Sequence, residues 1–240
     1  MTLKVNRGLP TRLVDGTIDT ESPRGSGYGE PYVIPFGRKV ASDEGLYFVA
    51  RNATPGTGVA GHAAPTSHDT EKAFILLKNG AASGGRLVYL DYLKLYVTAA
   101  GTAGSLNYAT HTIDRDRTFS SGGGDLTIVN VNLQSTINSV LSIAKIGAVV
   151  PAQANSAAAR IVAHQVVRQV IPVIGDVILF NFGGEPVTTG MITAGTAELE
   201  RVIHCPPLIF GPGESYHLVL WRASQSAAAS YECEIGYWER

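Results

Sequence analysis

Charged side chains are scarce in this chain of 240 residues, which contains 19 Lys and Arg and 20 Asp and Glu. A typical soluble chain has about 25% charged residues, which would be about 60 here. The formal net charge is −1, and the two signs are mixed along the chain. The sequence therefore lacks the basic surface on which binding to nucleic acid or to an anionic membrane depends.

Cysteine is nearly absent, since the chain has only Cys205 and Cys233. Two cysteines are too few for a disulfide framework, so the alternatives are one bridge between neighbouring strands or two buried thiols. Residues 1–8 lack the apolar run of a signal peptide. The best apolar run, 170–182, is interrupted by proline, glycine and aspartate and is too short to span a bilayer. We expect a soluble protein made in a cytosol.

Motifs that would indicate an enzyme fail on their context. Residues 56–61 (GTGVAG) match the dinucleotide fingerprint, but Pro65 follows where the fingerprint requires a helix. The Gly-x-Ser-x-Gly elbow of many hydrolases does not occur. Residues 114–117 (DRDR), from Asp114 to Arg117, form a charged group at the end of a predicted strand. We expect the local ion pairs within it to contribute little to stability. We therefore expect no catalytic residue and no cofactor.

Metal binding has one candidate set. The side chains that would suit zinc, if their strands are neighbours, are His204, Cys205, His217 and Cys233. The alternative, which we favour, is hydrogen-bonded histidines and buried thiols, because the His-x-His pair typical of β-barrel metalloenzymes is absent. We expect no metal.

Short apolar runs separated by turn residues begin at residue 46. In the clearest, 230–238, apolar and polar residues alternate, which is the pattern of a half-buried strand. The segments predicted as strands are 46–51, 73–79, 86–98, 106–114, 125–132, 144–150, 160–171, 176–182, 199–204, 215–222 and 230–238. Short helices are weaker alternatives at 134–143 and 157–159. This pattern predicts an all-β sandwich or barrel over residues 46–240.

Residues 1–45 differ from the rest, because they are rich in proline and glycine and show no sustained period. We predict an extended N-terminal arm. Its apolar residues 28–36 favour a strap that becomes ordered against another surface over a freely disordered tail.

Association with other subunits is indicated by where charge is missing. Segments 52–68 and 95–113 have no charged residue, and 118–159 has only Asp125 and Lys145. Subunit contacts are depleted in Lys and Glu, so we predict that these segments lie at contacts or in tight loops beside them. The residues predicted at interfaces are Tyr28, Tyr32, Ile34, Phe36, Trp221, Tyr237 and Trp238.

Several stretches resemble structural proteins of tailed bacteriophages. They are residues 46–58 (LYFVARNATPGTG), the strand pair around 86–97, residues 171–176 (IPVIGD) and the C-terminal EIGYWER of 234–240. The chain most resembles jelly-roll capsid decoration, or cement, proteins. The resemblance implies a jelly-roll body, a homotrimer on the capsid exterior of the virion and the major capsid protein as partner, with no catalytic residues. The alternative is a trimeric tail-fibre or receptor-binding module that recognises a host surface glycan.

Overall fold

The structure is a computed structural model that describes residues 37–63, 65–101, 107–152, 159–168, 171–183, 200–222 and 227–240. The chain divides into two units, residues 1–40 and 41–240. Residues 1–36 of the predicted arm lie outside the described residues. The helix α1 (Gly37–Asp43), which falls in the segment predicted as arm, was not expected, because seven residues are too few to show helical periodicity.

Each predicted strand is present. They are β1 (Tyr47–Asn52), β3 (Ala73–Asn79), β4 (Val88–Ala99), β5 (Asn107–Asp114), β7 (Gly124–Asn130), β8 (Leu141–Ala152), β9 (Arg160–Arg168), β10 (Val177–Phe182), β11 (Glu200–Cys205), β13 (Ser215–Arg222) and β14 (Ser230–Glu239). The short strands β2 (Val59–Ala60), β6 (Thr118–Ser121) and β12 (Leu208–Phe210) were missed, because two to four residues carry no readable alternation. The helical alternative at 134–143 is wrong, because 134–140 form a loop and 141–143 belong to β8, and most of the alternative at 157–159 lies outside the described residues.

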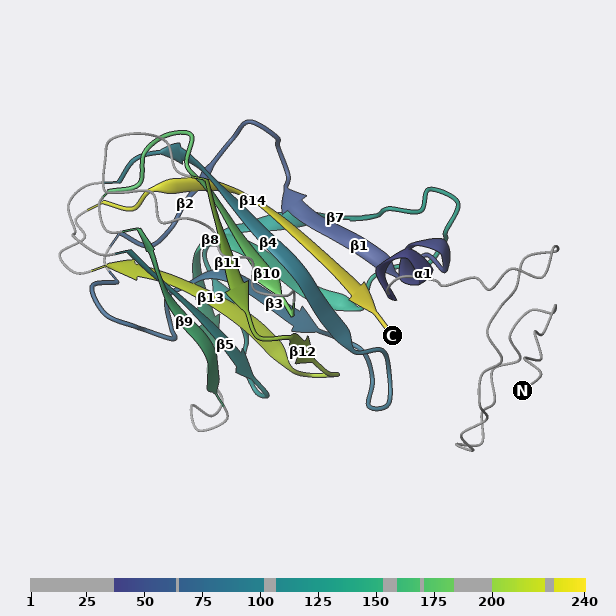
Figure 1. The fold of residues 1–240 in the computed structure, drawn as a ribbon. Coiled ribbons are helices and arrows are strands. Elements are labelled where there is room, and N and C mark those ends of the chain that lie inside the picture. The colour runs from purple at the N-terminus through teal and green to yellow at the C-terminus, as the bar shows by residue number, and fades with distance from the viewer. Residues whose placement is uncertain are drawn as a thin grey trace, which may run out of the picture. The chain divides into compact units, whose positions relative to one another are not determined.

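The strands form one continuous ladder folded into two layers (Figure 1). The first layer has the order β11-β10-β4-β14-β1-β7, and the second has the order β8-β3-β13-β5-β9. Strand β7 joins the layers, because it pairs with β1 along most of its length and with β8 at Gly124 and Asp125. All pairs except the parallel β10–β11 pair are antiparallel.

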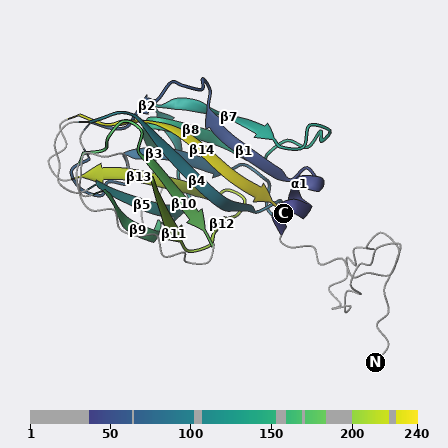
Figure 2. The ribbon, with the colours of Figure 1, turned by 45° about the horizontal axis from the view of Figure 1, so that its top comes forward.

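The order of the strands along the chain supports a jelly-roll-like fold. The strands β3 and β4, β4 and β5, β9 and β10, and β13 and β14 follow one another in the chain but belong to opposite layers, and Figure 2 shows β4 and β10 in front of β13. The last two strands are inserted centrally, β13 between β3 and β5 and β14 between β1 and β4. Such crossings between two packed sheets are typical of jelly rolls. The predicted all-β, jelly-roll-like sandwich is confirmed.

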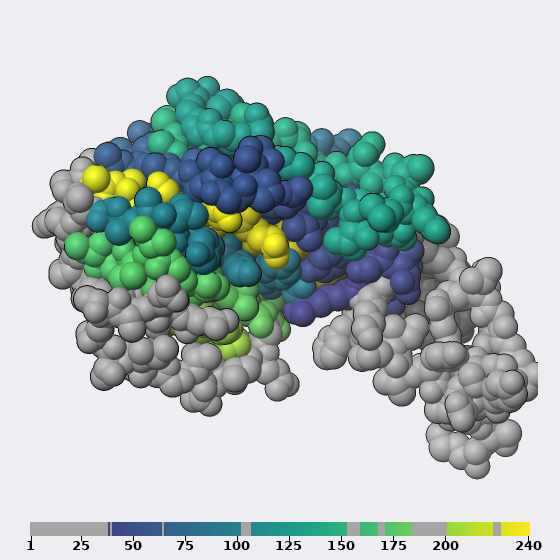
Figure 3. Space-filling view, turned by 90° about the horizontal axis from the view of Figure 1, so that it is seen from above, coloured from purple at the N-terminus to yellow at the C-terminus, as the bar shows by residue number. Residues whose placement is uncertain are grey.

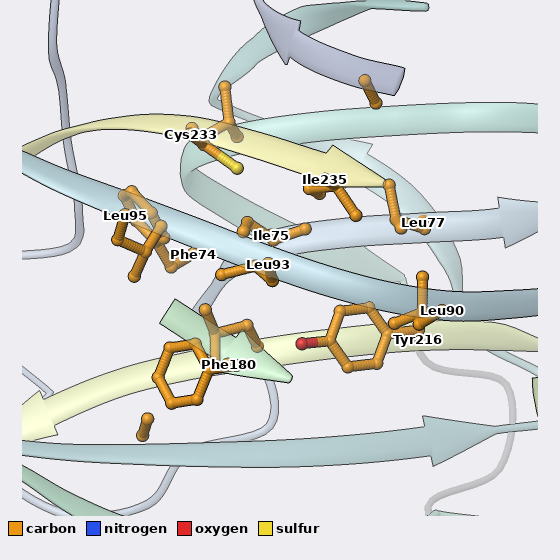
Figure 4. Close-up of a cluster of buried hydrophobic side chains, with 14 of the residues drawn as sticks. Phe74, Ile75, Leu77, Leu90, Leu93, Leu95, Phe180, Tyr216, Cys233 and Ile235 are labelled. Atoms are coloured by element: carbon orange, nitrogen blue, oxygen red, sulfur yellow. The ribbon is translucent and has the colours of Figure 1, made fainter. Parts of the chain in front are cut away.

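The core lies between the layers. Figure 4 shows Leu93 of β4 and Ile235 of β14 clustered with Phe74 of β3 and Tyr216 of β13. All four are almost completely buried. Burying one such large apolar side chain contributes roughly 1.5–3 kcal/mol, so this cluster dominates the stability of the body.

Among the described strands, β9 and β11 lie at the edges of the two layers, and side chains link them. The Arg201 Nη1 of β11 donates to the carbonyl oxygens of Val166 (2.8 Å) and Val167 (3.0 Å) of β9. The Gln165 Nε2 of β9 donates in return to the carbonyl oxygen of His204 (3.0 Å). These bonds occupy backbone groups that would otherwise be free to pair with another chain.

Candidate functional site: an apolar outer face

The outward side of the first layer should be polar, since a sandwich buries only one face of each sheet. At one end it is apolar instead. Register across β1, β14, β4 and β12 places Tyr47, Trp238, Tyr89 and Ile209 side by side on that outward face. Val131 continues the row, since its amide donates to the Tyr47 carbonyl oxygen (3.2 Å). We call these five residues the aromatic row.

A second row lies directly beside the first. It consists of Val129, Val49, Gly236 and Tyr92, from β7, β1, β14 and β4. A Cβ at Gly236 would overlap the Tyr92 ring and the Tyr47 hydroxyl, so both side chains lean over the glycine and cover its backbone. The two rows together form what we call the apolar outer face. Figure 3 shows this side of the molecule, with the yellow atoms of β14 between the blue atoms of β1 and β4.

Hydrogen bonds within the chain fix the tyrosine rings of this face. The Tyr47 hydroxyl donates to Asp91 Oδ2, and the Tyr92 hydroxyl donates to Glu234 Oε1, both at 2.7 Å. Burial, followed by the bond to Glu234, raises the pKa of Tyr92 above its usual value, so this phenol stays neutral. The Tyr89 and Trp238 rings are stacked, with centroids 3.8 Å apart and planes within 4°. The surface left for a partner is therefore rigid and mainly apolar.

The face continues into an exposed loop that follows β7. Leu133 is 97% exposed, and the exposed fractions of Val131 and Val129 are 44% and 39%. Side chains hold this loop: Asn130 Nδ2 donates to the Gly45 carbonyl oxygen (2.8 Å), and Asn132 Nδ2 donates to that of Asp43 (3.2 Å). These bonds hold the loop in place, so its backbone loses little conformational freedom when a partner covers it.

The next row of the sheet contains charged side chains. Arg51, Glu234 and Lys94 are cross-strand neighbours, so a negative side chain lies between two positive ones. They line a shallow groove that Tyr96 and Glu232 complete. The apolar outer face is thus bounded on this side by a row of alternating charge.

The residues predicted at interfaces have different positions. Trp238 lies in the apolar outer face. Tyr237 is fully buried, and its ring stacks on Phe48 while its hydroxyl bonds to Ser139 Oγ (2.8 Å). Its side chain is therefore part of the core and unavailable to a second subunit, which corrects the prediction for this residue. Tyr28, Tyr32, Ile34 and Phe36 lie outside the described residues.

Trp221 lies on the other layer, in an aromatic cluster. Its ring stacks on Tyr108 at 4.2 Å, and the ring of His164 lies 5.2 Å from Tyr108. The Trp221 Nε1 donates to Thr110 Oγ1 (3.0 Å). Trp221 is half-buried by its own chain. Its contact with another subunit stays a prediction.

One pair in the structure has the spacing of a nucleophile and its base. Ser215 Oγ lies 2.9 Å from His217 Nε2, and Ser215 also donates to the Asp114 carbonyl oxygen (3.2 Å). Both side chains are fully buried. Burial, followed by the charge of Arg117, lowers the pKa of His217 to about 3. A substrate has no route to this pair, so its role is structural.

The candidate zinc ligands do not converge. Among the described residues, no group of three or more metal-binding side chains comes together. Cys205 accepts a hydrogen bond from Gln165 Nε2 (3.5 Å), and His217 is bonded to Ser215. Both cysteines are free and buried, and burial raises the pKa of the Cys205 thiol to about 11.

The charged group at 114–117 differs from the expectation of a weak surface pair. Arg117 Nε donates to Asp114 Oδ2 at 2.8 Å, and both side chains are completely buried. The guanidinium also donates to the Thr70 carbonyl and hydroxyl oxygens, at 2.6 and 2.7 Å. A buried pair of this kind is costly to break, because removing one partner leaves the other charge buried and unpaired.

Trp238 was predicted at an interface from the sequence, but its neighbours in the row were not. The available signal was that Tyr47 and Val49 are apolar at outward positions of a strand whose inward positions are apolar as well.

No helix in the described part of the chain is long and apolar enough to cross a membrane. No family model, no curated protein and no solved structure matches this chain.

Proposed function

We propose that this chain is a non-enzymatic structural protein of a phage virion. It decorates the capsid exterior as a homotrimer assembled in the host cytoplasm, and it bridges neighbouring major capsid subunits. The observation that carries the proposal is the apolar outer face. Contiguous exposed apolar surface on a globular protein marks a place where another macromolecule binds.

The size of the face suits the centre of a protein–protein contact. Five strands about 4.8 Å apart span about 20 Å. A stable interface buries about 800 Å² on each partner, and its centre is apolar and depleted in charge. The residues of 126–144 are uncharged, and they add Leu133 to one side of the face. Burial against capsid or neighbouring subunits, and not chemistry, is the mechanism that these features support.

The first test is the oligomeric state of the purified protein. Mass photometry at micromolar concentration should show a trimer, and a clean monomer would refute the proposal. The second test is cosedimentation with undecorated phage shells, in which Leu133→Ser should reduce binding without changing the thermal midpoint. Equal binding of this variant would show that the loop carrying Leu133 does not contact the shell.

A receptor-binding module is the alternative function, favoured by the aromatic cluster of Tyr108, His164 and Trp221 on the other layer. Aromatic rings with a polar edge are common at recognition surfaces. A glycan array separates the two functions, because a decoration protein should bind none of its sugars. A specific glycan signal that Trp221→Phe removes would favour the receptor-binding function.

A further inference from the structure

We propose that the apolar outer face binds residues 28–36 (YGEPYVIPF) from the N-terminal segment of a second copy of this chain. The inference deepens the proposed function and rests on it for the requirement that copies associate. It assigns a specific occupant to the face, so that each copy supplies both a docking segment and a docking surface.

The chemistry of the face selects this kind of occupant. The hydroxyls of Tyr47 and Tyr92 are bonded to carboxylates of their own chain, so the rings offer their apolar parts. Trp238 and Tyr89 add a stacked pair in the same row. Grooves lined with aromatic side chains bind extended proline-containing segments, which are held in shape by the proline ring and need few hydrogen bonds.

The sequence of residues 28–36 fits that requirement. Pro31 and Pro35 fix their own backbone, and each also restricts the residue before it to extended conformations. Nine residues at about 3.1 Å each reach about 28 Å, which is enough to cross the width of about 20 Å estimated for five strands. Tyr28, Tyr32 and Phe36 recur at every fourth position, with Val33 and Ile34 between them.

Charge at the border of the face is compatible with this occupant. Glu30 is the one charged residue of 28–36. The row that bounds the face contains two cations, Arg51 and Lys94, around Glu234, and a second anion, Glu232, lies in the same groove. A carboxylate near the end of an otherwise apolar segment can approach these cations while the remainder of the segment covers the uncharged rows.

The test uses two variants of the full chain, each lacking one half of the contact. The segment variant carries Tyr32→Ser, Ile34→Ser and Phe36→Ser. The face variant carries Val131→Ser and Ile209→Ser, two residues that are 44% exposed, so the fold should tolerate both changes. Ile174→Ser is the matched control, because Ile174 is 57% exposed and is not part of either row.

Sedimentation velocity should show that the wild type and the Ile174→Ser control associate equally. The segment variant and the face variant should each associate more weakly by about tenfold or more. A mixture of the two should form a one-to-one complex, because the segment variant keeps an intact face and the face variant keeps an intact segment. Full association of the segment variant, or no complex in the mixture, would overturn the inference.

A second measurement does not depend on oligomers. With Trp221→Phe added to the segment variant, Trp238 is the one tryptophan left. A synthetic peptide of residues 28–36 should shift its emission to shorter wavelength and saturate, whereas a peptide with the three serines should not. Absence of the shift would overturn the inference. Cosedimentation with shells distinguishes failure of this inference from failure of the proposed function. If the protein binds shells but its copies do not exchange residues 28–36, only the inference is rejected. If its copies exchange this segment but the protein does not bind shells, only the proposed function is rejected.

Discussion

Two buried histidines should make the body sensitive to mild acid. His111 lies in β5, among Phe180, Phe182 and Tyr216, and His217 lies in β13. Burial lowers the pKa of His111 to about 3, and burial followed by Arg117 lowers that of His217 to about 3 as well. The ordinary histidine value is 6.5.

The sign of the effect follows from which state holds more protons. Between the two pKa values, the unfolded chain protonates both histidines and the folded chain does not, so the free energy of unfolding falls as pH drops below 6.5. Each unit of difference is worth about 1.36 kcal/mol. At pH 5, which is about 1.5 units below the unfolded value, each histidine removes about 2 kcal/mol, and the pair removes about 4 kcal/mol.

Urea unfolding at pH 7.5 and pH 5 measures this loss. The two histidines should together contribute a loss of about 4 kcal/mol in the wild type between the two conditions, and His217→Asn should lose about 2 kcal/mol less than the wild type. The substitution will also have a fixed cost, but this cancels because each protein is compared with itself. Equal stability of the wild type at both pH values, or an undiminished loss in His217→Asn, would refute the reasoning.

Three further outcomes are expected. Arg117→Met should lower the free energy of unfolding by about 3–5 kcal/mol, because it leaves the Asp114 carboxylate buried without a cation, and a loss under 1 kcal/mol in urea titration would contradict this. Gly236→Ala should cost about 1–3 kcal/mol through overlap with the Tyr92 ring, visible as a lower midpoint in calorimetry; an unchanged midpoint would mean that the ring moves aside freely. Arg201→Met should speed amide exchange in β9 and β11 while β14 stays protected, and unchanged exchange in β9 would show that the side-chain link is dispensable.

Strands were the predictable part of this fold. Alternation between an apolar core side and a polar outer side is visible in a single sequence, as in Cys233 and Ile235 with Glu232 and Glu234 between them. The apolar outer face was not predictable in the same way. It depends on Trp238 lying opposite both Tyr47 and Tyr89, and that register is set by pairing between segments far apart in the sequence.

The scarcity of charge has two different physical causes in the structure. In 107–113 the residues belong to β5, between β13 and β9, and Thr110, His111 and Thr112 are buried by the chain itself. In 129–137 the uncharged residues are mostly at the surface, with Leu133 and Val131 exposed. Composition alone does not separate burial within a chain from readiness for burial by a partner. Only the second segment bears on association.

The central position of the last two strands has a consequence for how the protein is made. Strand β13 lies between β3 and β5, and β14 lies between β1 and β4. Until both have been synthesised, β3 cannot be joined to β5, nor β1 to β4. Neither layer can close around the core before β13 and β14 have been made, so folding depends on contacts of long sequence separation. The unfinished chain exposes strand edges for that interval. Synthesis therefore has a vulnerable period that ends only when Ser230–Glu239 leaves the ribosome and completes the sheet.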